Sequence, residues 1–365
     1  MIMVKLSWEG KRDISERIPE YKKIYHDKFK KYEEIPRDIP ELPKNVTQTS
    51  SWKNILFWGD NLHIASFLLD KFTSKIDLIY IDPPFYSGLK YKIEVEENSN
   101  SYEDIAYFDH WDNNFDGYLQ AMYERLILLK HLLSERGLLF LHLDWHALHY
   151  MKILLDEIFG EKRFVNDIVW YYYNKYSAGK TNLPRAHDNI LVYAKSNSYT
   201  FNELRISREK PVKQLKREMV NGVLKNVKDE NGHVQYRVVT DKKMDDVWKI
   251  PCMQPASKQW TGFPTQKHHK LLDRIIELGS NENDLIADFY CGSSTTLLSA
   301  EKLKRRWIGC DSSPYAVYIT RRRLISYFSK NTPTHAVEFY TNLTPERENL
   351  IKSGFFEKDI KIKRV

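Results

Sequence analysis

Short apolar runs alternate with amphipathic stretches along two parts of the chain. Apolar runs of strand length occupy residues 54–58, 77–81, 138–143, 167–172 and 190–194. Apolar positions at helical spacing follow Asn61 and fill residues 119–133 and 151–159. After a polar segment the alternation returns as helix 271–278, strand 285–290, helix 295–303 and strand 307–310. Continuous apolar strands between helices predict an α/β fold with a mostly parallel sheet.

The same pattern divides the chain into five segments. Residues 1–50 form an N-terminal extension, predicted as a helical lead-in and then an extended linker containing Pro36, Pro40 and Pro43. Residues 51–196 and 261–327 are the two parts of one α/β domain. Residues 197–260 are an inserted basic region between them, and residues 328–365 are a charged C-terminal tail.

The composition is that of a soluble globular protein. The 365 residues are 42% hydrophobic and 29% charged, a length that predicts about two domains. No apolar run approaches the roughly 20 residues that cross a bilayer. The cysteines are Cys252, Cys291 and Cys310, and they form no CxxC pair. We therefore expect a cytoplasmic protein without a metal site, a disulfide framework or a membrane partner.

The positive charge is concentrated in one quarter of the chain. Residues 171–260 hold 17 basic and nine acidic residues, a net charge of +8, whereas the whole chain carries +7. Tyrosines precede the polar part of this window, at Tyr171, Tyr172, Tyr173 and Tyr176. Basic residues beside aromatic ones suit a nucleic-acid surface. The alternative is the solvated face of an ordinary domain.

The sequence of one loop is typical of a site that binds a nucleoside. The segment from Asp288 to Thr296, DFYCGSSTT, follows a buried strand and opens a helix. Glycine at such a turn lets a ligand approach the backbone closely. Asp311 ends the next strand, 23 residues after Asp288, where Rossmann-type folds bind ribose hydroxyls. The alternatives are a tight strand-helix turn and, for Asp311, a helix N-cap.

Two further loops place carboxylates at strand ends. Asp82-Pro83-Pro84-Phe85 follows the apolar strand 77–81. A carboxylate, a rigid carbonyl and an aromatic face suit a planar base that carries an exocyclic amine, although a rigid turn is the plainer interpretation. Asp60, in Gly59-Asp60-Asn61, is placed to accept from the amine of an adenine or to act as a helix N-cap.

Together these loops resemble the S-adenosylmethionine-dependent amino-methyltransferases of DNA, which act on N6 of adenine or N4 of cytosine. Residues 82–85 match the catalytic (D/N/S)PP(Y/F) motif of that family, and residues 265–267 (TQK) match its TQKP segment. Residues 288–296 match DPFAGSGTT, residues 307–311 match WIGID, and residues 59–62 match GD(N/C)L. The catalytic loop precedes the cofactor loop by about 200 residues, as in the permuted β-type methylases of type II and type III restriction-modification systems.

The resemblance implies a Rossmann-like fold with a mostly parallel seven-stranded sheet and a target-recognition region within 197–260. It implies a catalytic set made of Asp82, Pro83, Pro84 and Phe85. The implied cofactor-binding residues are Asp60, Asn61, Lys267, Asp288, Tyr290, Cys291, Gly292, Ser294, Thr295 and Asp311. We further predict that Lys213, Lys216 and Arg217 contact DNA phosphates or bases.

The cofactor segments depart from the family pattern at three positions. Tyr290 replaces the usual phenylalanine, Ser294 replaces the second glycine, and His268 replaces the proline after Gln-Lys. Serine fits such a loop if its φ is negative, so we expect S-adenosylmethionine to bind.

The implied activity is methyl transfer to the N6 amine of a flipped-out adenine at a specific DNA sequence. An aspartate before Pro-Pro favours adenine, since the N4-cytosine enzymes of the family more often carry serine there. The alternatives are an N4-cytosine methyltransferase and a catalytically inactive DNA-binding homologue. The resemblance implies double-stranded DNA, a cognate restriction endonuclease and a second copy of the chain as partners.

Overall fold

The computed structural model describes residues 5–14, 18–19, 29–44, 51–98, 100–109, 111, 114–175 and 181–364. The chain forms two compact units. Unit 1 contains Met1–Phe201 and Val247–Val365, and unit 2 is Asn202–Asp246. Unit 2 is therefore narrower than the predicted insertion of residues 197–260. Its C-terminal flank belongs to unit 1 because Trp248, buried at 2% exposure, joins the main sheet.

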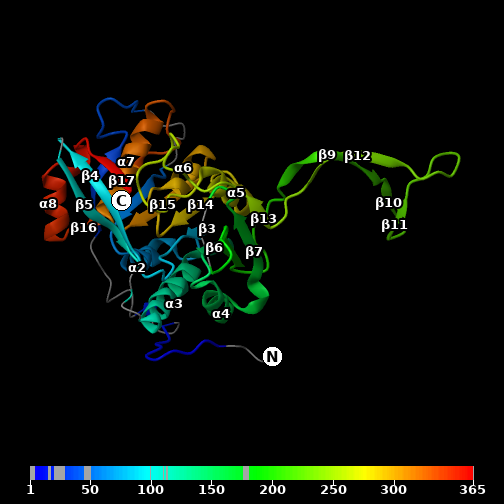
Figure 1. The fold of residues 1–365 in the computed structure, drawn as a ribbon, viewed down its shortest axis with the longest axis horizontal. Helices are drawn as coiled ribbons and strands as arrows, with labels where there is room; N and C mark the ends of the chain where they lie inside the picture. Colours follow the sequence, from blue (N-terminus) through cyan, green and yellow to red (C-terminus); the bar gives the residue numbers. More distant parts are fainter. Residues whose placement is uncertain are drawn as a thin grey trace. The chain divides into compact units, whose positions relative to one another are not determined.

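Unit 1 is built on a ten-stranded sheet, of which Figure 1 labels most strands. The strand order is β1 (Phe29–Ile35), β16 (Val337–Asn342), β2 (Asn54–Trp58), β15 (Arg306–Asp311), β14 (Leu285–Asp288), β3 (Ile76–Ile81), β6 (Leu133–Leu143), β8 (His187–Ala194), β7 (Phe164–Tyr171) and β13 (Val247–Lys249). The run from β16 to β6 is parallel, whereas β1 and β8 are antiparallel to their neighbours. The predicted mostly parallel sheet is confirmed, but its number of strands is ten and not seven.

Helices cover both faces of this sheet. Every residue of β3 is buried, as expected of a strand with an apolar layer on each side. Ile79 and Ile81 pack in one core cluster with α2 (Asn61–Phe72), α3 (Phe115–Leu132) and α4 (Leu148–Phe159). Leu78 points to the other face, where it lies against Gly279 of α5 (His269–Gly279). The helices α6 (Thr295–Lys302) and α7 (Pro314–Phe328) follow the cofactor-type loops.

Segments near both ends of the chain contribute to the sheet, which corrects the prediction of an extended linker and shows strands within the charged C-terminal tail. β1 forms the edge of the sheet by pairing with β16 from the C-terminal segment. Every second residue of β16 is buried, including Val337 and Phe339 at 0% exposure. β1 (FKKYEEI) and β16 (VEFYTN) mix apolar residues with charged or polar ones, so they lack the continuous apolar run of β3. Most of the predicted helical lead-in and Tyr176 lie outside the described residues.

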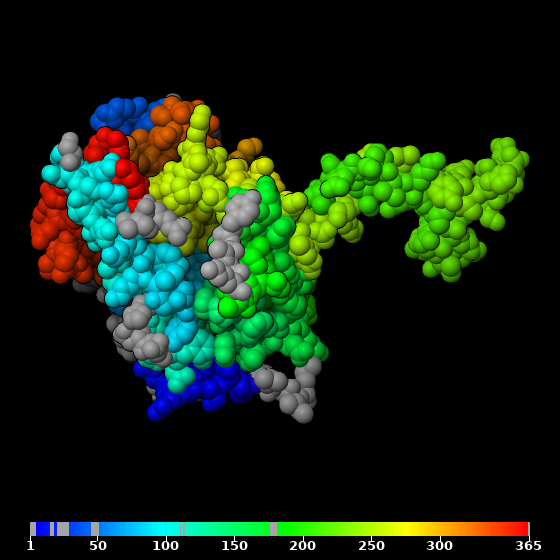
Figure 2. Space-filling model, in the orientation of Figure 1, coloured from blue at the N-terminus to red at the C-terminus, as the bar shows by residue number. Residues whose placement is uncertain are grey.

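A smaller antiparallel sheet stands beside the main one. Its strands are β17 (Lys361–Arg364), β4 (Lys90–Glu97) and β5 (Asn100–Phe108), in that order. Figure 2 shows the cyan β4–β5 hairpin next to the red C-terminal strand. The remaining elements of unit 1 are η1 (Glu161–Arg163), α8 (Pro345–Lys352) and η2 (Phe355–Glu357). No helix among the described residues is both long enough and apolar enough to span a bilayer.

Unit 2 is made of two antiparallel strand pairs. β9 (Arg205–Leu215) pairs with β12 (Tyr236–Lys243), and β10 (Arg217–Val220) pairs with β11 (Val223–Asn226). Most of its side chains are exposed, including Met219 at 68% and Val238 at 65%.

Candidate active site

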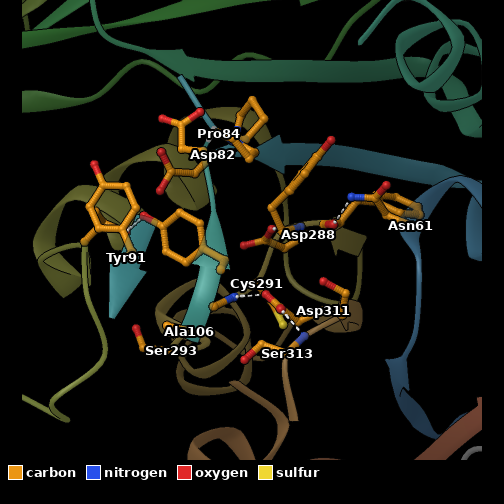
Figure 3. A pocket seen from close by; sticks show the side chains of 18 of the residues that line it. Asn61, Asp82, Pro84, Tyr91, Ala106, Asp288, Cys291, Ser293, Asp311 and Ser313 are labelled. Carbon is orange, nitrogen blue, oxygen red and sulfur yellow. Dashed lines mark hydrogen bonds between the residues drawn. The ribbon is translucent and has the colours of Figure 1, made fainter. Parts of the chain in front are cut away.

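The carboxyl ends of the central strands surround a cavity of about 480 Å³. That volume lies within the usual range of small-molecule sites. Figure 3 shows Asp82 and Tyr91 toward one side of the cavity and Asn61 toward the other. The predicted catalytic and cofactor residues line it together, with Ser294 as the exception. The predicted residues that line it are Asp60, Asn61, Asp82, Pro83, Pro84, Phe85, Lys267, Asp288, Tyr290, Cys291, Gly292, Thr295 and Asp311.

Asp82 directly follows β3, and its carboxylate lies between the Lys267 ammonium group and the His142 imidazole. One of its oxygens, Oδ2, forms an ion pair with Lys267 Nζ. The other oxygen, Oδ1, is buried, accepts no hydrogen bond within the described residues and lies 3.8 Å from His142 Nδ1. The carboxylate is therefore held through Oδ2 by Lys267, while its side chain keeps 15% exposure at the cavity.

His142 extends this arrangement behind the catalytic loop. It is fully buried on β6, where its Nδ1 lies 2.8 Å from the Tyr80 hydroxyl and its Nε2 lies 3.4 Å from Asp188 Oδ2. Burial raises the pKa of Asp188, but the hydrogen bond and charge of His142, with the charge of Lys267, lower that pKa below its usual value. The imidazole thus lies between two carboxylates, Asp82 and Asp188.

A second buried carboxylate fixes the backbone after Pro84. Asp109, at 2% exposure, accepts hydrogen bonds from the backbone N–H groups of Phe85 (3.1 Å), Tyr86 (2.8 Å) and Ser87 (2.9 Å). Tyr86 has a φ of +63°, a left-handed conformation that is costly for a bulky residue and needs such support. The Tyr118 hydroxyl donates to the Pro84 carbonyl over 3.0 Å. Sequence reasoning missed Asp109, because nothing in its local pattern separates it from a surface acid.

The loop after β14 is tied to the end of β15. Asp311 lines the cavity and accepts hydrogen bonds from Gly292 N (2.8 Å) and Ser313 N (2.9 Å). The N-cap of α7 is Ser313, so the alternative N-cap role predicted for Asp311 is wrong. Burial raises the pKa of Asp311. Asp288, at 2% exposure, accepts from Tyr290 N over 3.0 Å, and burial raises its pKa to about 7.

Two residues show how closely this loop is packed. Gly292 has a φ of +48°, and a Cβ there would meet the Phe263 ring at 3.2 Å. Ser294 has a φ of +61°, so the expectation of a negative φ is wrong. Its side chain is fully buried and bonds to the Thr320 hydroxyl, so it does not line the cavity. The serine is accommodated because its hydroxyl turns into the core, away from the ligand space.

Asp60 and Asn61 are joined to the cavity wall by an arginine. Asp60 Oδ1 caps α2 by accepting from Leu62 N over 2.8 Å, the simpler of the two predicted roles. Arg125 Nε donates to Asn61 Oδ1 over 2.6 Å, and its Nη2 lies 3.3 Å from Asp60 Oδ2. Asn61 Nδ2 in turn donates to the Phe289 carbonyl over 3.0 Å. Arg125 lies on α3 and was not predicted, since its helix was recognised only by its apolar face.

An aromatic wall closes the side of the cavity next to the β4–β5 hairpin. The rings of Tyr91 and Tyr107 stack with centroids 4.6 Å apart, and Tyr107 stacks on Phe263 at 6.2 Å. The Tyr107 hydroxyl lies 3.0 Å from Thr265 Oγ1, next to the TQK segment. These rings give the cavity flat apolar surfaces suited to planar groups. Sequence reasoning did not assign them, because the hairpin alternates tyrosine with charge.

The predicted DNA contacts lie in unit 2. Lys213, Lys216 and Arg217 are exposed there, with Lys216 Nζ 3.4 Å from Gln235 Oε1 and Arg217 Nε 3.2 Å from Asn226 Oδ1. Unit 2 holds 11 basic and eight acidic residues. The rest of the window 171–260 therefore holds six basic and one acidic residue, so most of the positive excess belongs to unit 1.

The residues of the cavity fit a nucleoside-containing cofactor. A carboxylate has about four acceptor positions, and two backbone N–H groups use only part of that capacity at Asp311. Gly292 leaves the loop without a side chain at its tightest point. The donors and acceptors around it are backbone groups and carboxylates, as hydroxyl groups and a sulfonium require.

The sequence of the chain is similar to a known protein family and to several known proteins. The model of a DNA methylase family matches residues 76–322. The type II methyltransferase M.EcaI of Enterobacter cloacae is 27% identical over 88% of this chain and 77% of its own length. The StyLTI Mod subunit of a type III restriction-modification enzyme from Salmonella typhimurium is 23% identical over 71% of this chain. The chain spans about half (51%) of that subunit.

Two solved structures are also similar to this chain. The M1.HpyAVI–SAM complex has a TM-score of 0.46 at 19% identity, covering 74% of this chain and 98% of that chain. The PvuII DNA methyltransferase, described as cytosine-N4-specific, has a TM-score of 0.49 at 16% identity, covering 86% of this chain and 98% of that one.

Proposed function

The chain belongs to the DNA methylase family whose model covers residues 76–322, and we propose that it methylates the N6 amine of a flipped-out adenine. Enzymes of this family take the methyl group from S-adenosylmethionine, which presents it on a positively charged sulfur. The observation that carries the proposal is the convergence of Asp82, Phe85, Asp288 and Asp311 on one cavity. Two of these four residues belong to the catalytic loop and two to the cofactor loops.

The cofactor would lie along the loops after β14 and β15. Asp311 is placed to accept from ribose hydroxyls, and the backbone between Tyr290 and Gly292 offers peptide groups to the methionine end. Asp60 and Asn61, held by Arg125, are placed for the adenine end. Tyr290 and Thr295 complete the lining, and Lys267 lies between this region and Asp82.

The catalytic loop would orient the target amine. The Asp82 carboxylate and the Pro83 carbonyl are hydrogen-bond acceptors that fit the two hydrogens of an exocyclic amine. Accepting both hydrogens draws the nitrogen toward tetrahedral geometry and directs its lone pair out of the plane of the base. Phe85 offers a ring face that replaces the stacking lost when a base leaves the duplex. Positioning and electrostatics of this kind supply most of the rate acceleration.

The structure supports this orienting role through the contacts behind the loop. Asp109 and Tyr118 fix the backbone of the loop, and Lys267 fixes the Asp82 carboxylate. Asp82 needs only to accept a hydrogen bond, because the methylated ammonium is acidic and loses its proton readily. An intact acceptor set also favours an active enzyme over an inactive DNA-binding homologue.

The choice of adenine rests on the aspartate of the DPPF loop. N4 of cytosine is the alternative target, since its amine presents the same two hydrogens. Two of the similar proteins are named as restriction-modification subunits or type II methyltransferases, which supports a role in protecting DNA from a cognate endonuclease. That endonuclease, a homodimer, and DNA contacts by Lys213, Lys216 and Arg217 stay predictions.

Methyl transfer to unmethylated genomic DNA tests the proposal. Methyl-labelled S-adenosylmethionine is supplied, and the DNA is then digested to nucleosides. Label in N6-methyladenine supports the proposal. Label in N4-methylcytosine keeps the site but replaces the target, and bound cofactor without transfer to DNA contradicts the enzymatic role.

A further inference from the structure

Unit 1 carries exposed aromatic rings beside the catalytic loop, on the part of the sheet edge that the cofactor loops do not use. Trp145 is 49% exposed, Tyr173 is 48% exposed and Tyr171 is 39% exposed. Single exposed rings are common on protein surfaces, whereas exposed rings grouped at one place can mark a binding site. None of the three lines the cavity.

Strand register shows that these rings belong to one edge. Ile81, which precedes Asp82, pairs with Leu141 of β6, and Leu143 at the end of β6 pairs with Asn189 of β8. Tyr171 at the end of β7 pairs with His187 of β8 and with Lys249 at the end of β13. The carboxyl ends of β3, β6, β7 and β13 therefore follow one another with the amino end of β8. Trp145 lies two residues beyond β6, and Tyr173 lies two residues beyond β7.

A cation accompanies two of the rings. The Arg185 guanidinium lies over the Trp145 ring at 4.0 Å, and Lys249 Nζ lies over the Tyr173 ring at 5.4 Å. Both cations are themselves exposed. We name the set of Trp145, Tyr171, Tyr173, Arg185 and Lys249 the aromatic strip.

The charge around the strip favours a polyanion. Besides Arg185 and Lys249, Lys175 lies at this edge, with its Nζ 5.0 Å from the centre of the Tyr172 ring. Asp144, next to Trp145, is bonded to His146. Asp188 is largely buried against His142, so its charge is turned inward. Rings interleaved with exposed cations fit the bases and phosphates of a nucleic acid.

We propose that the aromatic strip binds the DNA next to the flipped base, an inference that rests on the proposed function. Flipping leaves a neighbouring stack broken and the opposite base without its partner. Trp145 packs against His146, with ring centroids 3.8 Å apart, as well as against Arg185, and its remaining exposed surface and that of Tyr173 are available to such unstacked bases. Arg185 and Lys249 neutralise adjacent phosphates. Unit 1 would then contact DNA through the aromatic strip, in addition to the contacts predicted for unit 2.

The opposite end of β7 provides a matched control. Phe164 begins that strand, is 36% exposed, and has Lys152 Nζ over its ring at 4.5 Å. This is a ring with a cation on the same strand, at the edge of the sheet away from Asp82. Phe164→Ala and Lys152→Gln therefore make the same types of substitution as the strip variants. They do so at the opposite edge of the sheet.

The experiment measures binding of the full chain to a mixed-sequence duplex and to its single strand across a range of salt concentrations. Arg185→Gln and Lys249→Gln are expected to reduce the slope of log K against log salt by about 0.9 each on the duplex. Trp145→Ala and Tyr173→Ala are expected to weaken single-strand binding about tenfold without changing that slope. The two control variants are expected to match the wild type.

Two outcomes would contradict DNA binding by the aromatic strip without contradicting the proposed function. One is a wild type that methylates DNA together with strip variants that bind like the controls. The other is strip variants with unchanged DNA binding but an altered sedimentation coefficient without DNA, which assigns the surface to a protein partner. A wild type that transfers no methyl group to DNA instead contradicts the proposed function itself.

Discussion

Lys267 forms an ion pair with Asp82 across 185 residues of sequence. The two residues come from different motifs, the TQK segment before α5 and the DPPF loop after β3. Both side chains are largely buried, at 11% and 15% exposure. The pair therefore links the segment next to the cofactor loop with the carboxylate that is to accept from the target amine.

The first prediction concerns this pair. Lys267→Met removes the cation and leaves one Asp82 oxygen without its charged partner, which costs more than a surface ion pair would. We expect kcat for methyl transfer to fall at least about tenfold, with Lys267→Arg retaining more activity than Lys267→Met. Single-turnover transfer to genomic DNA measures both variants. Equal rates for wild type and Lys267→Met would show that the pair has no role in orienting Asp82.

The second prediction concerns the clamp on the catalytic loop. Asp109→Ala leaves three backbone N–H groups of residues 85–87 without their acceptor. Losing such partners costs about 1–3 kcal/mol per buried group, so we expect a measurable fall in Tm and a larger fall in kcat. Asp109→Asn keeps an acceptor oxygen and serves as the milder variant. An Asp109→Ala protein with normal Tm and kcat is the contrary result.

The third prediction separates the cofactor from the DNA. Asp311→Ala removes the acceptor placed for the ribose and also releases Gly292 N. We expect Kd for S-adenosylmethionine to rise roughly tenfold or more, while DNA affinity without cofactor stays unchanged. Calorimetric titration and DNA binding measure the two separately. Unchanged cofactor affinity would remove Asp311 from the binding set.

The fourth prediction is a pH dependence of stability. Burial raises the pKa of Asp288 from its usual value of 3.8 to about 7. The folded state therefore holds this proton more tightly than the unfolded state, and this residue makes stability fall as pH rises from about 4 to about 7. Asp288→Asn should lessen that fall in denaturant titrations over this range. An identical pH profile for the variant and the wild type is incompatible with the raised pKa.

Much of the fold followed from the sequence because the central strands are buried on both faces. Residues 77–81 and 138–143 were predicted as strands from their apolar runs, and the catalytic loop follows the first of them. β1 and β16 were missed for the opposite reason. β1 is an edge strand that mixes charged and apolar residues, and β16 beside it buries only every second residue. The inserted basic region was delimited by its composition, which does not locate a boundary such as Val247.

The site was predicted where its residues lie in contiguous loops and missed where they arrive from elsewhere. Asp82 and Asp311 each lie at the end of an apolar strand, so the sequence predicted that both lie at the edge of the sheet. Three residues reach the loops from other elements: Asp109 from the end of a hairpin, Arg125 from a helix and His142 from a neighbouring strand. The sequence around each of them does not indicate these contacts. The backbone of Ser294 was misjudged because its φ depends on the buried Thr320 hydroxyl, which sequence spacing does not reveal.

The most direct test of the account compares Asp82→Ala with the wild type in methyl-labelled transfer to unmethylated genomic DNA, followed by nucleoside analysis. The account predicts label in N6-methyladenine for the wild type. For Asp82→Ala it predicts a loss of at least about a hundredfold, with S-adenosylmethionine binding retained. Undiminished transfer by Asp82→Ala, or wild-type label confined to N4-methylcytosine, would contradict it.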